Sequence, residues 1–279
     1  MPELPEVETT VRGLAHVLKG ARLARVEPRR GDLRRPFPEG LAQALTGARV
    51  THLSRRAKYG VIHTDRDRAL VFHLGMSGRW RIDPSERGMH DHLVIETDKG
   101  ARVSLCDPRR FGSVDLVDEA GLDAWPAFAA LGPEPLGEGL TAAHLATVFK
   151  GRKPAVKIAL LDQRNVAGLG NIYVCEALFR AGLSPFKPAA RLATKTAKPT
   201  PAARRLVPQI KSVLQEAIRA GGSTLRDYKQ ADGSIGAFQN EFQVYGREGE
   251  PCSRPSCRGR VRRKTQGGRS TFYCPVCQR

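Results

Sequence analysis

The first six residues, Met-Pro-Glu-Leu-Pro-Glu, combine a potential nucleophile with two potential proton donors. Removal of the initiator methionine leaves Pro2 with a free secondary amine. An α-amino group titrates near pH ~8, so part of it is unprotonated at neutral pH. Attack of such an amine on a sugar aldehyde gives an iminium ion, which acts as an electron sink. Glu3 and Glu6 are placed to move the protons that this chemistry needs.

The same residues also fit an ordinary capped helix start. Proline suits the first turn of a helix, and carboxylates there complement the helix dipole. The apolar residues that follow share one helical face and end at a glycine, in the order Val7, Val11, Leu14, Leu18 and Gly20. We expect a helix under either interpretation, so this segment alone does not decide between catalysis and capping.

Four of the six cysteines lie in the last 28 residues, as Cys252, Cys257, Cys274 and Cys277. Two close pairs separated by sixteen residues are typical of a four-cysteine zinc ribbon, in which a structural Zn²⁺ has no open position. Two disulfides are the alternative, and they are disfavoured in a reducing compartment. Cys106 and Cys175 have no spaced partner and are expected to be buried thiols.

The chain of 279 residues carries a formal net charge of +18, which favours a polyanionic partner. No stretch approaches the ~20 apolar residues of a membrane span, and the N-terminus lacks the pattern of a secretory signal. These features predict a cytosolic nucleic-acid binder. After Glu250 the tail has no acidic residue and eight basic ones, so the cysteine-rich segment is expected to lie on phosphates.

Short apolar runs rich in valine and isoleucine predict a sandwich or barrel of strands in the first half of the chain. The runs lie between residues 21 and 117, and examples are 48–53, 60–64, 70–74, 92–97, 102–105 and 113–117. A linker composition at 132–139 predicts a domain boundary. Beyond it the period is helical, over 141–150, 154–163, 171–181 and 202–220, and residues 185–200 are expected to form an exposed loop.

Several turns between these elements carry residues suited to nucleic-acid contact. The segment from Asn165 to Asn171 has two glycines before a helix that Asn171 can cap, and exposed amides at a helix start bind phosphate. The loops containing Met76 and Phe111 are framed by glycines and can insert bulky side chains between base pairs. By default such residues belong to a core. His90 and His92 suggest a metal pair, but without a nearby third ligand a polar contact at a strand edge is favoured.

Together these segments resemble formamidopyrimidine-DNA glycosylase, the bacterial enzyme family that removes 8-oxoguanine and ring-opened purines. The resemblance covers nearly the whole chain, and the motifs occur in the family's order. They are Pro2-Glu3-Leu-Pro-Glu6, Arg-Ala-Lys58-Tyr-Gly, His73-Leu-Gly-Met76, Asp107-Pro-Arg-Arg-Phe111, Gly168-Leu-Gly-Asn171-Ile-Tyr, Gln243-Val-Tyr245-Gly-Arg and Arg269-Ser-Thr-Phe-Tyr-Cys274.

The resemblance implies an α+β chain in three parts. A catalytic β-sandwich with a leading helix would span 1–132. A helix–two-turns–helix DNA-binding domain with a loop that covers the flipped base, at 221–240, would span 133–240. A β-hairpin zinc ribbon holding one Zn²⁺ would span 241–279. The implied partner is damaged double-stranded DNA, bound by a cytoplasmic monomer.

The resemblance also implies roles for single residues. Pro2 would attack C1′ of the damaged nucleotide, Glu3 would protonate the ring oxygen or leaving group, and Glu6 would order the site. Lys58 would assist β-elimination and Arg269 δ-elimination. Met76, Arg109 and Phe111 would fill the emptied base stack. The remaining residues implied at the DNA are His73, His90, Arg110, Arg152, Lys157, Asn171 and Tyr245.

One departure from the family and two alternatives remain. The first cysteine pair encloses four residues, whereas many members have two, which puts the local loop shape in doubt. The sister enzyme endonuclease VIII shares the terminal proline and zinc ribbon but prefers oxidised pyrimidines. The arrangement of Met76, Arg109 and Phe111 argues against endonuclease VIII. A DNA-binding protein without catalysis would leave Pro2 and Glu3 unexplained.

Overall fold

Residues 2–224, 230–231 and 233–279 are described by the structure, a computed structural model. The chain divides into two compact units, each formed from two segments. The first unit contains Met1–Ala129 and Ile218–Gln239, and the second contains Ala130–Ala217 and Asn240–Arg279. The three-part division at 132 and 240 stays a prediction, and the unit boundaries group residues 218–239 with the N-terminal part.

Helix α1, Leu4–Leu18, forms where the sequence predicts it. The Glu3 N–H donates to the Glu6 carboxylate at 2.8 Å, which satisfies one of the amides that a helix start leaves open. Val7, Leu14 and Leu18 are fully buried on its apolar face. The helix ends before Gly20, whose φ of 74° lies in the left-handed region that glycine tolerates.

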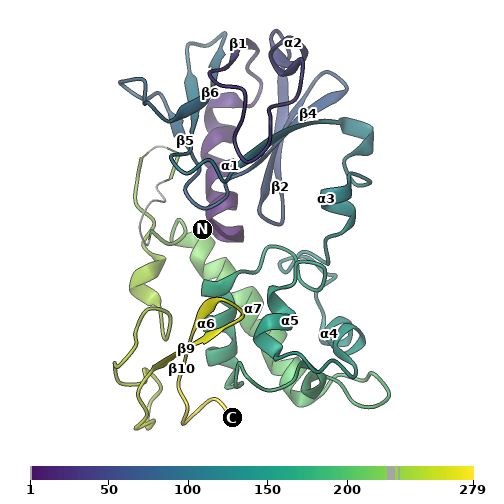
Figure 1. The fold of residues 1–279 in the computed structure, drawn as a ribbon, viewed down its shortest axis with the longest axis vertical. Helices are drawn as coiled ribbons and strands as arrows, with labels where there is room; N and C mark the ends of the chain where they lie inside the picture. Colours follow the sequence, from purple (N-terminus) through teal and green to yellow (C-terminus); the bar gives the residue numbers. More distant parts are fainter. Residues whose placement is uncertain (1, 225–229, 232) are drawn as a thin grey trace. The chain divides into compact units, whose positions relative to one another are not determined.

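The first unit also contains two antiparallel four-stranded sheets (Figure 1). One sheet has the order β1-β6-β7-β5 and the other the order β2-β3-β4-β8. The strands are β1 (Leu23–Pro28), β2 (Val50–Arg56), β3 (Tyr59–Thr64), β4 (Arg68–His73), β5 (Arg79–Ile82), β6 (Asp91–Thr97), β7 (Arg102–Cys106) and β8 (Ser113–Asp118).

The core of the unit joins α1 to side chains from both sheets. Phe72 of β4 and Trp80 of β5 are buried, and their ring centroids lie 5.4 Å apart. Gly60 pairs with Phe72 across β3 and β4, and a Cβ at position 60 would lie 2.1 Å from the Phe72 ring. This close approach explains a glycine inside a strand. The predicted β-sandwich behind a leading helix is confirmed.

Short helices complete the first unit: α2 (Leu41–Leu45), η1 (Glu119–Gly121) and α3 (Pro126–Ala129). Phe128 of α3 packs on the Tyr59 ring at 5.5 Å between centroids. His63 of β3 contacts Glu119 of η1 through Nδ1 and the Ser54 hydroxyl of β2 through Nε2. These contacts fasten the segment after β8 to the sheet that it follows.

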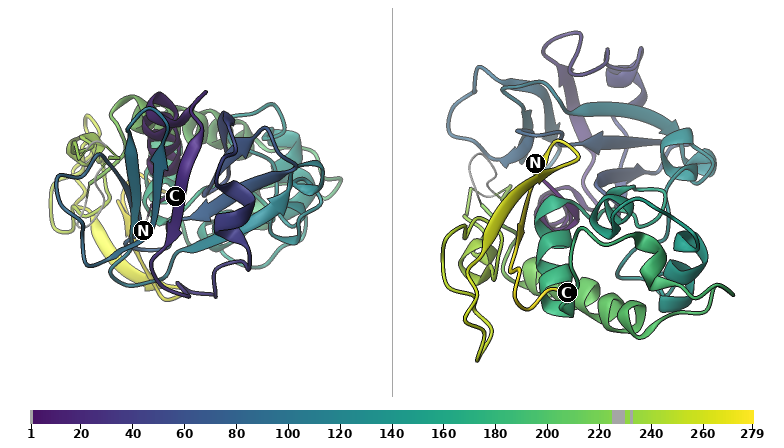
Figure 2. Two further views of the ribbon diagram at one scale, coloured as in Figure 1. Left: turned by 90° about the horizontal axis from the view of Figure 1, so that it is seen from above. Right: turned by 60° about the horizontal axis from the view of Figure 1, so that its bottom comes forward.

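The second unit is built from helices and one hairpin. The helices are α4 (Ala142–Phe149), α5 (Val156–Leu161), η2 (Ala189–Leu192), α6 (Asn171–Ala181) and α7 (Pro201–Arg219), with η3 (Phe238–Glu241) at the unit boundary. Strands β9 (Arg262–Gln266) and β10 (Arg269–Tyr273) pair antiparallel around Gly267 and Gly268, both with positive φ (Figure 2, yellow). Among the described residues, no helix combines the length and apolar character needed to cross a membrane.

The structure departs from the predicted elements at three places. Strands β1 and β5 lie within the region where strands were expected but are not among the apolar runs named as examples, because arginines interrupt their apolar pattern. The predicted helix at 154–163 is shorter at both ends. Residues 185–200 are not wholly exposed, because η2 buries Ala189 and Leu192.

Candidate active site, zinc centre and their supports

Three turns gather at one end of the sheet β2-β3-β4-β8. They are the β2–β3 turn with Lys58, the segment after β4 with Met76, and the segment before β8 with Phe111. Because β3 and β8 both run antiparallel to β4, the start of β3 and β8 lies beside the end of β4. The fold therefore brings together residues that are separated by more than fifty positions in the sequence.

The Glu6 carboxylate connects the start of α1 to residues 222–223. One oxygen accepts the Glu3 N–H, and the other accepts the Ser223 N–H at 2.8 Å and the Ser223 hydroxyl at 3.0 Å. Glu3 and Glu6 are each only 2% exposed, and Pro2 is buried beside them. Ser223 is a support that the sequence analysis missed, since nothing local links it to a residue 217 positions away.

The Lys58 turn is fixed to α1 through Arg55. The Arg55 guanidinium donates to the Glu8 carboxylate of α1 at 2.9 Å and to the Ala57 carbonyl at 3.0 Å. Ala57 has a φ of 53°, which lets two residues close the hairpin. Lys58 is 8% exposed, so the fold positions this lysine firmly beside the first turns of α1.

His73 is held in its neutral form at the end of β4. Burial, together with the positive charge of Lys58 and two arginines, lowers the pKa of His73 to about 4. Its Nδ1 accepts the Gly75 N–H at 3.0 Å, which a protonated ring cannot do. His73 therefore fixes the backbone that leads into the Met76 segment.

We expect the first unit to lose stability in mild acid because of His73. The folded pKa lies below the unfolded value of 6.5, so this stabilisation is complete above pH 6.5 and is lost as the pH falls toward 4. The shift corresponds to about 3 kcal/mol at most. Urea unfolding at pH 7 and pH 4.5 measures it, and a His73→Gln variant should depend less on pH. An unchanged pH dependence in that variant would contradict this assignment.

The Met76 and Phe111 segments lie against each other, and their tips face solvent. A Cβ at Gly75 would lie 2.3 Å from the Phe111 carbonyl carbon, and Gly75 has a φ of 61°. Met76 is 41% exposed and Phe111 is 44% exposed, with the Arg109 guanidinium 4.8 Å from the Phe111 ring centroid. Neither apolar residue belongs to the core, so the default interpretation of these side chains is wrong.

Asp107 organises the Phe111 segment from beneath. Its buried carboxylate accepts the Ser77 hydroxyl at 2.6 Å and the Gly112 N–H at 2.8 Å. The Ser77 hydroxyl in turn accepts the Arg109 N–H at 3.2 Å. Arg110 is exposed and lies 3.8 Å from the Asp32 carboxylate. The sequence marked Asp107 as part of a motif but gave no sign of this supporting role.

The two histidines around Asp91 do not form a metal site with any described residue. The buried His92 ring contacts the Asp107 carbonyl at 2.9 Å, as the predicted polar contact requires. The His90 carbonyl accepts the Asp107 N–H at 3.0 Å. Both histidines thus lie at the base of the Phe111 segment.

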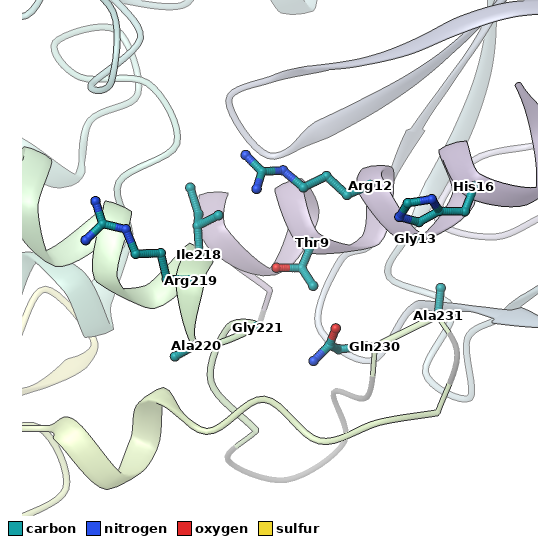
Figure 3. A pocket seen from close by; sticks show the side chains of 10 residues that line it. All are labelled: Thr9, Arg12, Gly13, His16, Ile218, Arg219, Ala220, Gly221, Gln230 and Ala231. Carbon is teal, nitrogen blue, oxygen red and sulfur yellow. The ribbon is translucent and has the colours of Figure 1, made fainter.

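Ser223 and Ala231 of the 221–240 loop contact α1, whereas residues 225–229 and 232 lie outside the described residues. A Cβ at Gly13 would lie 3.3 Å from the Ala231 methyl, and the Ala231 carbonyl accepts the Ile82 N–H at 2.7 Å. Figure 3 shows Gln230 and Ala231 opposite Thr9 and Gly13, across a cavity of about 400 Å³. The predicted covering of a flipped base by this loop stays untested.

Four cysteines of the second unit meet at one point. The Sγ atoms of Cys252, Cys257, Cys274 and Cys277 all lie within 4.8 Å of one another. Two of the separations are 3.7 and 3.8 Å, far beyond a disulfide bond but close to the ~3.8 Å edge of a tetrahedron with ~2.3 Å zinc–sulfur bonds. The thiolates fit one structural zinc ion. Cys106 and Cys175 are buried thiols, as predicted.

Asn171 does not cap α6 with its side chain, contrary to expectation. Gly170 occupies the cap position, and Asn171 is the first helical residue. Its amide instead donates to the Ser270 carbonyl of β10 at 2.9 Å and lies 3.5 Å from the Tyr245 hydroxyl. The side chain therefore joins the helix start to the hairpin.

Glu176 fixes the segment that carries Tyr245. This fully buried carboxylate accepts the backbone N–H groups of Gln243, Val244 and Tyr245 at 2.8–3.2 Å. A carboxylate in a closed interior is tolerated when several donors replace its water. Sequence reasoning missed Glu176, because its partners lie almost seventy positions away.

The other predicted DNA-contacting residues of this unit differ in exposure. Lys157 is fully buried and donates to the Thr271 hydroxyl at 2.8 Å and the Ser270 carbonyl at 3.2 Å. Arg152 and Arg269 line one open cavity of about 510 Å³. Lys157 thus supports the hairpin, while the two arginines face solvent.

Three consecutive family models match the chain. The formamidopyrimidine-DNA glycosylase N-terminal domain matches residues 1–114, and the H2TH domain of the same enzymes matches residues 131–229. A zinc finger found in FPG and IleRS matches residues 249–279. The three models cover the β-sandwich, the helices and the cysteine hairpin in turn.

Whole-length relatives agree with these matches. The formamidopyrimidine-DNA glycosylase of Novosphingobium aromaticivorans is 64% identical, and that of Rhizorhabdus wittichii is 62% identical, over the full length of both chains. A Lactococcus lactis FPG mutant in complex with Fapy-dG DNA superposes with a TM-score of 0.89 at 35% identity over both whole chains. The MutM (FPG) protein of Thermus thermophilus gives 0.86 at 40% identity, covering 99% of this chain and 98% of that one. The chain belongs to the formamidopyrimidine-DNA glycosylase family.

Proposed function

We propose that the chain excises oxidised purines, 8-oxoguanine and formamidopyrimidines, from duplex DNA and then cleaves the strand as an AP lyase. The observation that carries this proposal is the arrangement at the start of α1. A buried Pro2 and Glu3 stand beside a Glu6 carboxylate that binds both the Glu3 amide and Ser223. Rigid support of this kind is what a nucleophile at a chain terminus needs.

In the proposed reaction, the Pro2 nitrogen attacks C1′ of the damaged nucleotide and the bond from C1′ to the base breaks. Glu3 supplies the proton for the ring oxygen or the leaving base, and ring opening gives an iminium ion. Loss of a C2′ proton then expels the 3′ phosphate, assisted by Lys58. Elimination of the 5′ phosphate follows, assisted by Arg269, and water releases the sugar fragment from Pro2. Glu6 keeps the terminus in place throughout.

The proposed DNA interface has two components. Met76, Arg109 and Phe111 fill the gap that base flipping leaves, which their exposure on a rigid base supports. The proposed phosphate contacts are His73, His90, Arg110, Arg152, Asn171 and Tyr245. Lys157 supports this interface indirectly, because its ammonium group donates hydrogen bonds to Ser270 and Thr271 of β10. We place the enzyme in the cytoplasm as a monomer, with the zinc ion stabilising the hairpin and taking no part in the chemistry.

We expect DNA affinity to fall steeply with salt, because binding to phosphates releases counterions. With four to six phosphate contacts, affinity should drop by about 10²–10³ between 50 and 200 mM salt. An Arg269→Gln variant should lower the slope of the logarithmic plot by about one. Fluorescence anisotropy with an uncleavable abasic duplex measures both, and a flat salt response would exclude a phosphate-led interface.

Substrate preference separates the proposal from its alternatives. Duplexes carrying 8-oxoguanine opposite cytosine should be cleaved faster than duplexes carrying an oxidised pyrimidine. Faster cleavage of the pyrimidine lesion would instead indicate the specificity of endonuclease VIII. Binding without cleavage of either duplex would indicate a DNA-binding protein without catalysis.

A further inference from the structure

A pocket of about 280 Å³ in the second unit takes no part in the proposed reaction. It lies between the first turn of α7, helix η2 and residues 183–188. The lining residues used in the argument are Val156, Leu183, Leu192, Lys187, Arg191 and Arg205. Every residue around it is described by the structure, and none belongs to the family motifs that the sequence analysis identified.

The pocket joins an apolar floor to a cationic rim. Val156 and Leu192 are 4% and 2% exposed, so the floor is formed by side chains of the core. Lys187, Arg191, Arg205 and Arg279 stand around it, and no acidic side chain lines it; the terminal Arg279 also brings its main-chain carboxylate, which lies 3.5 Å from the Ser184 N–H. Lys187, Arg191 and Arg205 form no ion pair with any side-chain carboxylate of the described residues. Four basic side chains against one main-chain carboxylate leave the rim with a net positive charge.

We propose that this pocket docks an acidic segment of a partner protein that carries one apolar side chain. The volume lies just below the ~300–1,000 Å³ of small-molecule sites, so it suits a single anchoring side chain. Carboxylates on either side of that anchor would meet the lysine and arginines. Buried anchors surrounded by charge pairs are a common way for proteins to recognise peptides.

Nucleic acid fits the pocket less well than a peptide does. The phosphodiester backbone has no apolar group to fill the floor, and unstacked bases bind on aromatic rings. No aromatic residue lines the pocket. The apolar floor is thus the feature that separates this site from a general phosphate-binding surface.

A labelled peptide tests the proposal on the full-length zinc-loaded protein at 150 mM salt. The probe is acetyl-Asp-Asp-Asp-Leu-Asp-Asp, and the control peptide replaces its leucine with asparagine at equal charge. Burial of the leucine should make the probe bind roughly tenfold more tightly than the control. Amide resonances of Leu183, Thr200 and Ala202 should shift with the probe. Equal affinities of the two peptides would overturn the proposal.

Two charge reversals on α7 give a matched comparison. Arg205 lines the pocket, whereas its neighbour Arg204 is exposed and does not. Arg205→Glu should lower the affinity for the probe roughly tenfold, and Arg204→Glu should lower it less than threefold, since only the first variant removes a charge-assisted contact. Equal losses of affinity in the two variants would overturn the proposal, because they would show that the probe responds only to the net charge of the protein. A second result would also overturn the proposal. In it, a short DNA duplex competes with the probe for the same site, and Arg205→Glu lowers the affinity for DNA as much as the affinity for the probe.

Discussion

Replacing Pro2 with glycine should lower the rate of strand cleavage at least hundredfold, while DNA affinity stays within about threefold of the original. A glycine amine rotates freely, so it loses the fixed orientation that the proline ring gives to the attacking nitrogen. A hundredfold loss corresponds to about 2.7 kcal/mol of transition-state stabilisation. Single-turnover cleavage of an 8-oxoguanine duplex measures the rate, and an uncleavable abasic duplex measures the affinity.

A second protein removes the amine without changing the side chain. An N-terminal extension that is left attached converts the Pro2 nitrogen to an amide, which cannot attack C1′. This protein should bind DNA but cleave nothing, and proteolytic removal of the extension should restore cleavage. Full activity of either altered protein would exclude Pro2 as the nucleophile. Loss of affinity in both would show that the terminus contributes to DNA binding instead.

Removing zinc should abolish DNA binding and leave the β-sandwich folded. Zinc binding contributes ~10–16 kcal/mol to small structural sites. The hairpin it stabilises has a basic strand whose residues, such as Arg262 and Lys264, are exposed and cannot form a core. Without the hairpin, Lys157 and Asn171 lose their contacts with Ser270. We expect at least a hundredfold loss of affinity on treatment with excess chelator.

Adding zinc back is the control for this experiment. Affinity should recover with one equivalent of zinc, and a Cys274→Ser variant should not recover fully. Cys274 is fully buried, so serine there removes a thiolate ligand without adding a charge. Unfolding of the sandwich is followed separately through tryptophan fluorescence, because Trp80 and Trp125 both belong to the first unit. If DNA affinity is unchanged after measured loss of the metal, the hairpin is not part of the DNA interface.

The sequence was sufficient for features that depend on local pattern. Helix α6 has the predicted bounds Asn171–Ala181, and the four cysteines converge as their spacing indicated. Local pattern did not single out β5, because Arg79 and Arg81 flank Trp80 and the burial of this strand comes from its neighbours. It also failed at Asn171, because the choice between a cap and a contact with β10 depends on a residue 99 positions away.

The supports of the candidate site could not be predicted for the same reason. Glu6, Glu176 and Asp107 each bind backbone amides or hydroxyls from distant segments. Such partners follow from tertiary packing and leave no periodic signal in the chain. Lys157 shows the opposite case, since a lysine predicted at a phosphate is fully buried against the hairpin. The family resemblance predicted the functional positions, and the structure shows that Lys157 among them is buried in contacts within the protein.

The most direct test of the proposed mechanism is borohydride trapping on a duplex with 8-oxoguanine opposite cytosine, followed by mass mapping of the cross-link. Reduction of the iminium ion should give a stable protein–DNA adduct on the Pro2 nitrogen. This result would demonstrate removal of Met1 and the covalent lyase step together. An adduct on Lys58, or no adduct from protein confirmed to begin at Pro2 and to bind the duplex, would contradict the mechanism.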